Sequence, residues 1–67
     1  MSEQIHIERI EKVSNGIDHA MYVRGVVGGK SVEGYVGMPS FQDAERKGAK
    51  EVRTQVENAL RNLAEGA

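Results

Sequence analysis

The chain contains no cysteine, which excludes disulfide bonds and thiolate metal sites. Its only histidines, His6 and His19, do not form an HxH or HxxxH spacing that would place two imidazoles around one metal ion. We therefore expect no metal ligands, no bound cofactor and no catalytic residues.

Long apolar runs are also missing. The longest uninterrupted stretch of apolar side chains is 20–23, and Arg24 follows it at once. A membrane-spanning helix needs about 20 consecutive apolar residues. Residues 1–4, Met-Ser-Glu-Gln, lack the basic and then apolar profile of a signal peptide. We therefore expect a cytoplasmic protein that does not enter a membrane.

No charge sign dominates. Nine Lys and Arg oppose ten Asp and Glu, which leaves a formal charge of −1 and argues against a strongly basic nucleic-acid module. The 28% charged and 39% hydrophobic residues are typical of a folded domain. With 67 residues, the chain is expected to form one small domain over 1–67 with little core to spare.

Two glycine-containing dipeptides divide the first part of the chain. Asn15-Gly16 and Gly28-Gly29 are typical of two-residue hairpin turns, which need positive φ at both central positions. They predict a β-meander over about 4–38, with strands near 4–13, 18–27 and 30–38. The segment 25–31 resembles a phosphate-binding P-loop, but it has one residue too few and continues as a strand, so we interpret it as a hairpin.

The register of the second hairpin can be predicted from its pattern. A turn centred on Gly28-Gly29 places all the apolar pairs on one face of the sheet. On the other face, this register pairs Tyr22 with Tyr35 and Arg24 with Glu33. A shift of one residue would destroy both patterns, because neighbouring side chains point to opposite faces.

The first hairpin is less regular. A two-residue turn at Asn15-Gly16 would place Ile10 opposite Met21. Ile5 and Ile7 then reach the apolar face only if one extra residue is accommodated near 8–9, which predicts a β-bulge. The alternative is that the first strand stops near residue 8 and a loose connection follows.

The last third of the chain predicts a helix over about 40–64. Ser40 and Asp43 fit a capping box. The small and apolar positions after them are spaced by threes and fours, as in one stripe of an amphipathic helix. The expected fold class is therefore α+β: a three-stranded antiparallel sheet followed by one long C-terminal helix packed on one face.

Gly48 lies within this predicted helix, where glycine costs about 1 kcal/mol relative to alanine. The simplest interpretation is that Ala44 and Gly48 pack closely against Gly25 and Gly34 of the sheet. The alternatives are a hinge or a tight contact with a partner.

A helix over 41–64 would be about 36 Å long, whereas the strands span only about 30 Å. The helix end should therefore project beyond the sheet and expose Val56, Leu60 and Leu63. Exposed leucines favour a partner, so we expect a homodimer through a helix-to-helix contact. The alternative geometry joins two edge strands into a six-stranded sheet.

Two surfaces carry possible functional residues. One helix covers only one sheet face, which leaves Tyr22, Arg24, Glu33 and Tyr35 uncovered. Tyrosine and arginine are enriched at protein-binding hot spots, although the same pairs could simply stabilise an exposed sheet. The second surface is the basic start of the helix, with Arg46, Lys47, Lys50 and Arg53. It is either a solvated face or a small anion-binding site.

The strand–strand–strand–helix order, together with Phe41, Ala44-Glu45 and the basic helix start, resembles two nucleic-acid modules. One is the second half of a double-stranded-RNA-binding domain, and the other is the arm-binding domain of phage-type integrases. The resemblance implies phosphate contacts by the basic helix. The chain departs from the arm-binding pattern because Arg24 is opposed by Glu33 rather than lying on a basic sheet.

The sequence therefore favours a non-enzymatic protein-interaction module. An adaptor or inhibitor fits, including the kind of phage or mobile-element accessory protein that docks on a host protein. The alternative hypothesis is a nucleic-acid-binding domain that uses the four basic helix residues, with weak affinity.

Overall fold

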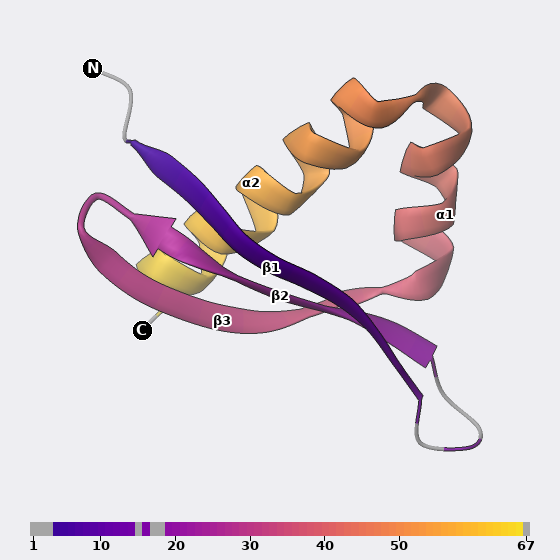
Figure 1. Cartoon of the computed structure of the whole chain (residues 1–67), viewed down its shortest axis with the longest axis horizontal. Helices are drawn as coiled ribbons and strands as arrows, with labels where there is room; N and C mark the ends of the chain where they lie inside the picture. The colour runs from indigo at the N-terminus through magenta and orange to yellow at the C-terminus, as the bar shows by residue number, and fades with distance from the viewer. Residues whose placement is uncertain (1–3, 15, 17–18, 67) are drawn as a thin grey trace.

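The computed structural model describes residues 4–14, 16 and 19–66 and has an α+β fold. Three antiparallel strands form one sheet in chain order, and two helices follow them on one face (Figure 1). The elements are β1 (Ile5–Ser14), β2 (His19–Val27), β3 (Lys30–Gly37), α1 (Met38–Lys47) and α2 (Ala49–Gly66). The predicted fold class, a three-stranded antiparallel sheet with a C-terminal helix packed on one face, is confirmed.

The second hairpin has the predicted register. Gly28 and Gly29 have φ of 56° and 85°, the positive values that a two-residue hairpin turn requires. Val27 pairs with Lys30 next to the turn. Further along the hairpin, Tyr22 pairs with Tyr35 and Arg24 with Glu33, as predicted. The sequence 25–31 is therefore a hairpin and does not form a P-loop.

The predicted β-bulge is also confirmed. The register of β1 against β2 shifts between Ile7, opposite Gly25, and Arg9, opposite Arg24. Glu8 is thus the extra residue on β1. The bulge allows Ile5 and Ile7 to pack against the apolar core.

The predicted register of the first hairpin beyond the bulge is wrong. Ile10 lies opposite Val23 rather than Met21, and the pairing continues to Ser14 and His19. The connection is therefore longer than a two-residue turn, and Asn15 itself lies outside the described residues. A shift of two residues keeps every side chain on its own face, so the apolar pattern could not distinguish the two registers.

The helical part begins earlier than predicted, and Ser40 is not its N-cap. Gly37 is the capping residue, with extended backbone and no side-chain hydrogen bond, and Pro39 lies in the first turn of α1. Proline suits this position because the first helical N–H groups have no intrahelical acceptor. The carbonyl oxygen of Ser40 instead accepts a hydrogen bond of 3.0 Å from Nε2 of Gln55, which joins α1 to α2.

The expected continuous helix is divided at Gly48. This residue has φ of 123° and ψ of 171°, a conformation that is essentially restricted to glycine. Its N–H donates to the carbonyl oxygens of Ala44 and Glu45 and ends α1, while its own carbonyl accepts from Glu51 and Val52 and begins α2. Gly48 therefore breaks the helix rather than packing within it.

The break lets α2 turn back across the sheet, as Figure 1 shows. The side chain of Leu60 lies over Gly25, and that of Leu63 lies over Gly34. Two predictions are corrected here: the leucines, not Ala44 and Gly48, pack on the two sheet glycines, and the helix end does not overhang the sheet.

The core lies between the sheet and the helices. Val23, Val56 and Leu60 are completely buried. The remaining buried hydrophobic residues come from β2, β3 and α1 and are Met21, Val27, Val32, Val36, Phe41 and Ala44. Because this layer covers one face only, the opposite face of the sheet carries the exposed side chains.

Replacement of Gly48 by alanine distinguishes a helix break from a continuous helix. We expect Gly48→Ala to destabilise the fold by about 1–3 kcal/mol, because alanine rarely adopts this conformation. Gly37→Ala is the comparison: Gly37 has φ of −60° and no atom near its missing Cβ, so this variant should lose only the smaller preference for glycine at an N-cap. Urea unfolding measures both. A continuous helix would instead make Gly48→Ala stabilising by about 1 kcal/mol.

The two sheet glycines should differ in their tolerance of alanine. A Cβ on Gly25 would lie 2.5 Å from the carbonyl oxygen of His6, whereas a Cβ on Gly34 would meet only the end of the Leu63 side chain, at 2.6 Å. Backbone cannot move as easily as a leucine methyl group. We expect Gly25→Ala to lose about 1–3 kcal/mol and Gly34→Ala to lose clearly less in the same urea titration. Equal losses would contradict this packing.

Candidate functional site

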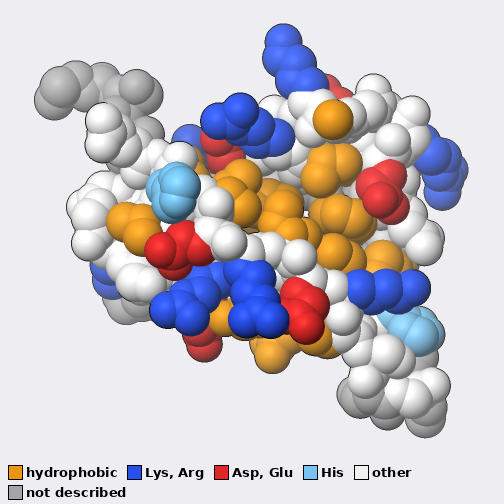
Figure 2. Space-filling model, in the orientation of Figure 1, with side chains coloured by type: hydrophobic (Ala, Val, Ile, Leu, Met, Phe, Trp, Pro, Cys, Tyr) orange, Lys and Arg blue, Asp and Glu red, His pale blue; other side chains and the backbone are white. Residues whose placement is uncertain are grey.

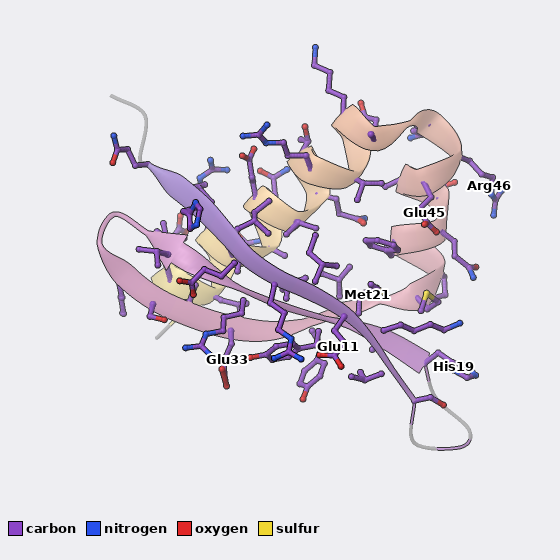
Figure 3. The ribbon with its side chains drawn as sticks, in the orientation of Figure 1. Glu11, His19, Met21, Glu33, Glu45 and Arg46 are labelled. Atoms are coloured by element: carbon purple, nitrogen blue, oxygen red, sulfur yellow. The ribbon has the colours of Figure 1, made fainter. Side chains whose placement is uncertain are left out.

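The candidate site is the sheet face that the helices leave uncovered, which we call the outer face. In Figure 3, Glu11 of β1 and Glu33 of β3 point away from both helices, whereas Met21 points toward α1. The side chains of this face alternate along each strand with those of the core. All four predicted protein-binding residues lie on it and are contributed by β2 (Tyr22, Arg24) and β3 (Glu33, Tyr35).

Tyr22, Tyr35 and Glu33 form one cluster on the outer face. The two rings meet edge to face, with centroids 5.7 Å apart and planes at 60°, a favoured geometry for aromatic pairs. The hydroxyl of Tyr22 donates a hydrogen bond of 2.9 Å to Oε2 of Glu33. Tyr22 is thus held on both sides, while Tyr35 remains 67% exposed.

The expected ion pair between Arg24 and Glu33 is not formed. Although the two residues are cross-strand neighbours, Nε of Arg24 lies 3.5 Å from Oε1 of Glu8. The carboxylate of Glu33 instead accepts from Tyr22. The bulge supplies the reason, because the extra residue Glu8 stands beside Arg24 on the outer face. The residue spacing predicts the bulge but gives no sign of this contact.

A second ion pair, 2.8 Å between Arg9 and Glu11, lies on the same face. Exposed pairs of this kind stabilise by about 0–1 kcal/mol each, so they contribute little to the fold. Their effect is local: they hold long charged side chains beside the tyrosine cluster. The outer face therefore combines an exposed aromatic ring with charged side chains of both signs.

The pKa of Tyr22 is raised above its ordinary value of 10.0. The main cause is the hydrogen bond to Glu33, which is made only by the protonated hydroxyl; partial desolvation and the negative charge of Glu33 act in the same direction. Arg24 and Arg9 oppose the shift. Tyr22 thus stays a neutral hydrogen-bond donor throughout the physiological pH range.

The basic residues of the alternative site are divided between two helices. Arg46 and Lys47 end α1, whereas Lys50 and Arg53 lie after the break at Gly48. Lys47 lies 3.9 Å from Asp43 and Arg53 lies 3.4 Å from Glu57, so two of the four charges have acidic neighbours. In Figure 2 the blue side chains over the helical layer stand as separate groups.

The residues expected to form a helix-to-helix dimer contact are mostly buried in the core of the same chain. Val56 and Leu60 are 0% exposed, and Leu63 is half-buried over Gly34. The premise that they lack intrachain partners is wrong, because the break at Gly48 places α2 over the sheet. Of these three residues, only Leu63 keeps apolar surface that a second chain could reach.

The described part of the chain has open surface hollows and no cluster of metal-ligating side chains. No three His, Asp or Glu side chains of the described residues gather as metal ligands. The larger surface hollows are open grooves, one of about 430 Å³ beside β3 and the end of α2. Within residues 4–14, 16 and 19–66, no helix is long and apolar enough to cross a membrane.

Comparisons of the chain with protein-family models, with curated proteins and with solved structures found no match.

A titration of Tyr22 tests the cluster directly. In a Tyr35→Phe variant, Tyr22 is the only tyrosine, and its ultraviolet titration should give a pKa above 10.0. Adding Glu33→Gln should lower that pKa, because the negative acceptor is removed. Because the folded-state pKa is raised, this contribution to stability is complete below the unfolded pKa and is lost as the pH rises through the folded pKa. A pKa that Glu33→Gln leaves unchanged would rule out the hydrogen bond.

Proposed function

We propose that the chain is a small non-enzymatic protein-binding module, an adaptor or inhibitor that docks on another protein through the outer face of its sheet. The observation that supports this most is the Tyr35 ring, which is 67% exposed and is positioned by the ring of Tyr22. A rigid aromatic side chain loses little conformational entropy when it binds. Tyrosine is also among the residues most enriched at interface hot spots.

The surroundings of Tyr35 suit a protein partner. Glu33 and Arg24 flank the rings as potential hydrogen-bonding groups, and each is already oriented by a neighbour, Tyr22 or Glu8. An aromatic centre within a polar rim is the usual arrangement of a protein interface. The proposed partner surface therefore presents an apolar hollow for Tyr35 with polar groups around it.

Nucleic-acid binding is the competing function, and the structure favours it less. Four phosphate contacts would give a salt slope of about −3.6 on duplex DNA. Here Lys47 and Arg53 have acidic neighbours, and the four basic residues lie on both sides of a helix break. These features reduce the positive potential that phosphates would meet.

Site-specific photo-crosslinking identifies the partner and tests the surface together. A benzophenone side chain at position 35 should crosslink to one protein in an extract of the source cells, whereas the same group at position 50 on α2 should not. Binding of that protein is then measured by calorimetry. We expect Tyr22→Ala and Tyr35→Ala each to weaken binding by about thirtyfold, which corresponds to roughly 2 kcal/mol.

The control is Lys50→Ala, which lies on the helical side and should leave the affinity unchanged. Melting temperatures distinguish lost contact from lost fold, since the exposed Tyr35 contributes little to stability. A partner that tolerates both tyrosine variants would refute the proposed surface. Salt-sensitive submicromolar binding of generic duplex DNA or RNA, lost on Lys47→Glu with Lys50→Glu, would instead support the nucleic-acid function.

A further inference from the structure

The two edges of the sheet differ in their protection against another strand. β1 carries the bulge at Glu8, which interrupts regular pairing, and four of the five residues from Glu8 to Lys12 are charged. Bulges and charges are the usual features that protect an edge strand. β3 is a regular strand of eight residues with no bulge in its pairing to β2 and no proline within it. β3 is therefore the open edge.

The register shows which backbone groups of β3 point outward. The N–H of Gly28 donates to the carbonyl oxygen of Gln4, on the β1 side. The backbone N–H and C=O groups of successive residues point to opposite sides of a strand. Those of Val27 therefore point toward β3, where Val27 forms the hydrogen-bonded pair with Lys30 that closes the hairpin. It follows that the N–H and C=O groups of alternate residues of β3 point away from the sheet. These residues are Ser31, Glu33, Tyr35 and Gly37, and all four are exposed. At Gly37, the N-cap of α1, only the N–H is open to a partner strand, because the carbonyl of an N-cap residue accepts the first helical hydrogen bond.

We infer that two copies of the chain pair through β3, antiparallel and around a two-fold axis at Gly34, to form a six-stranded sheet. This register joins seven residues of each strand. It pairs Ser31 with Gly37 of the second copy and Glu33 with Tyr35 of the second copy. A two-fold axis at Glu33 would place two carboxylates directly opposite each other, and an axis at Tyr35 would bring Ser31 against Pro39, which has no N–H to donate.

The apolar face at this edge supports a second copy as the occupant. Leu63 lies half-buried over Gly34, and the open groove beside it is lined by residues that include Val32 and Leu63. With the axis at Gly34, the two glycines face each other without side chains, so Leu63 of each copy can meet across them. Val32 then lies opposite Val36 of the second copy. Leucine burial thus accompanies the backbone hydrogen bonds.

This dimer is independent of the proposed docking partner, because it uses the edge of the sheet rather than its outer face. It places two outer faces side by side in one continuous sheet. Each Tyr35 then lies next to Glu33 of the other copy as well as next to its own Tyr22.

Sedimentation equilibrium of the whole chain tests the inference. The expected mass is twice the 7.3 kDa of one chain. Tyr35→Pro removes an outward N–H that has no partner within the chain, so it should give a monomer with unchanged far-ultraviolet circular dichroism. Lys12→Pro is the matched control: it removes an outward N–H from the β1 edge and should leave the dimer intact.

Two further variants test the register without altering the backbone. Tyr35→Lys places a positive charge opposite Glu33 of the second copy. Because the dimer contains two such pairs, its dissociation constant should fall about twofold to thirtyfold, whereas Tyr35→Glu should raise it to a similar extent. A monomeric wild-type chain at every concentration would overturn the inference. A dimer that survives Tyr35→Pro would do the same, and so would equal dissociation constants for the lysine and glutamate variants.

Discussion

The contact between the leucines of α2 and the glycines of the sheet determines the rest of the structure. Leu60 fills the space above Gly25, and Leu63 fills the space above Gly34, so the helix approaches the sheet more closely than any Cβ would allow. That approach buries Val56 and Leu60 completely. In a domain of this size, a core of a few such side chains must supply most of the net stability. The break at Gly48 serves this contact, because it turns α2 back across the sheet.

Covering one face in this way leaves the other face of the sheet exposed to solvent. On the outer face, the exposed ring of Tyr35 depends on a chain of contacts that runs through Tyr22 to Glu33. The bulge supports the same surface by placing Glu8 beside Arg24. At the edge, β3 keeps a regular row of outward backbone groups, and Leu63 lies beside it. The two edges thus differ in backbone regularity: β1 is interrupted by the bulge, whereas β3 is not.

Short-range patterns predicted much of this fold. The Gly28-Gly29 turn fixed the register of the second hairpin, and the misplaced isoleucines of β1 indicated the bulge, since both depend on strand alternation alone. The helix break escaped prediction because a small residue at a core-facing position fits a continuous stripe as well as a break. The first hairpin register escaped because a shift of two residues preserves the faces. The partner of Arg24 followed from the bulge geometry, which residue spacing does not specify.

Both the core and the exposed outer face depend on which face of the sheet α2 covers, and nuclear Overhauser contacts measure that directly. The structure predicts contacts from the Leu60 methyl groups to the Hα protons of Gly25 and from the Leu63 methyl groups to those of Gly34. It predicts none from the ring of Tyr35 to either leucine. Contacts between the Tyr35 ring and the methyl groups of Leu60 or Leu63 would contradict the account, because the proposed binding face would then lie under the helix.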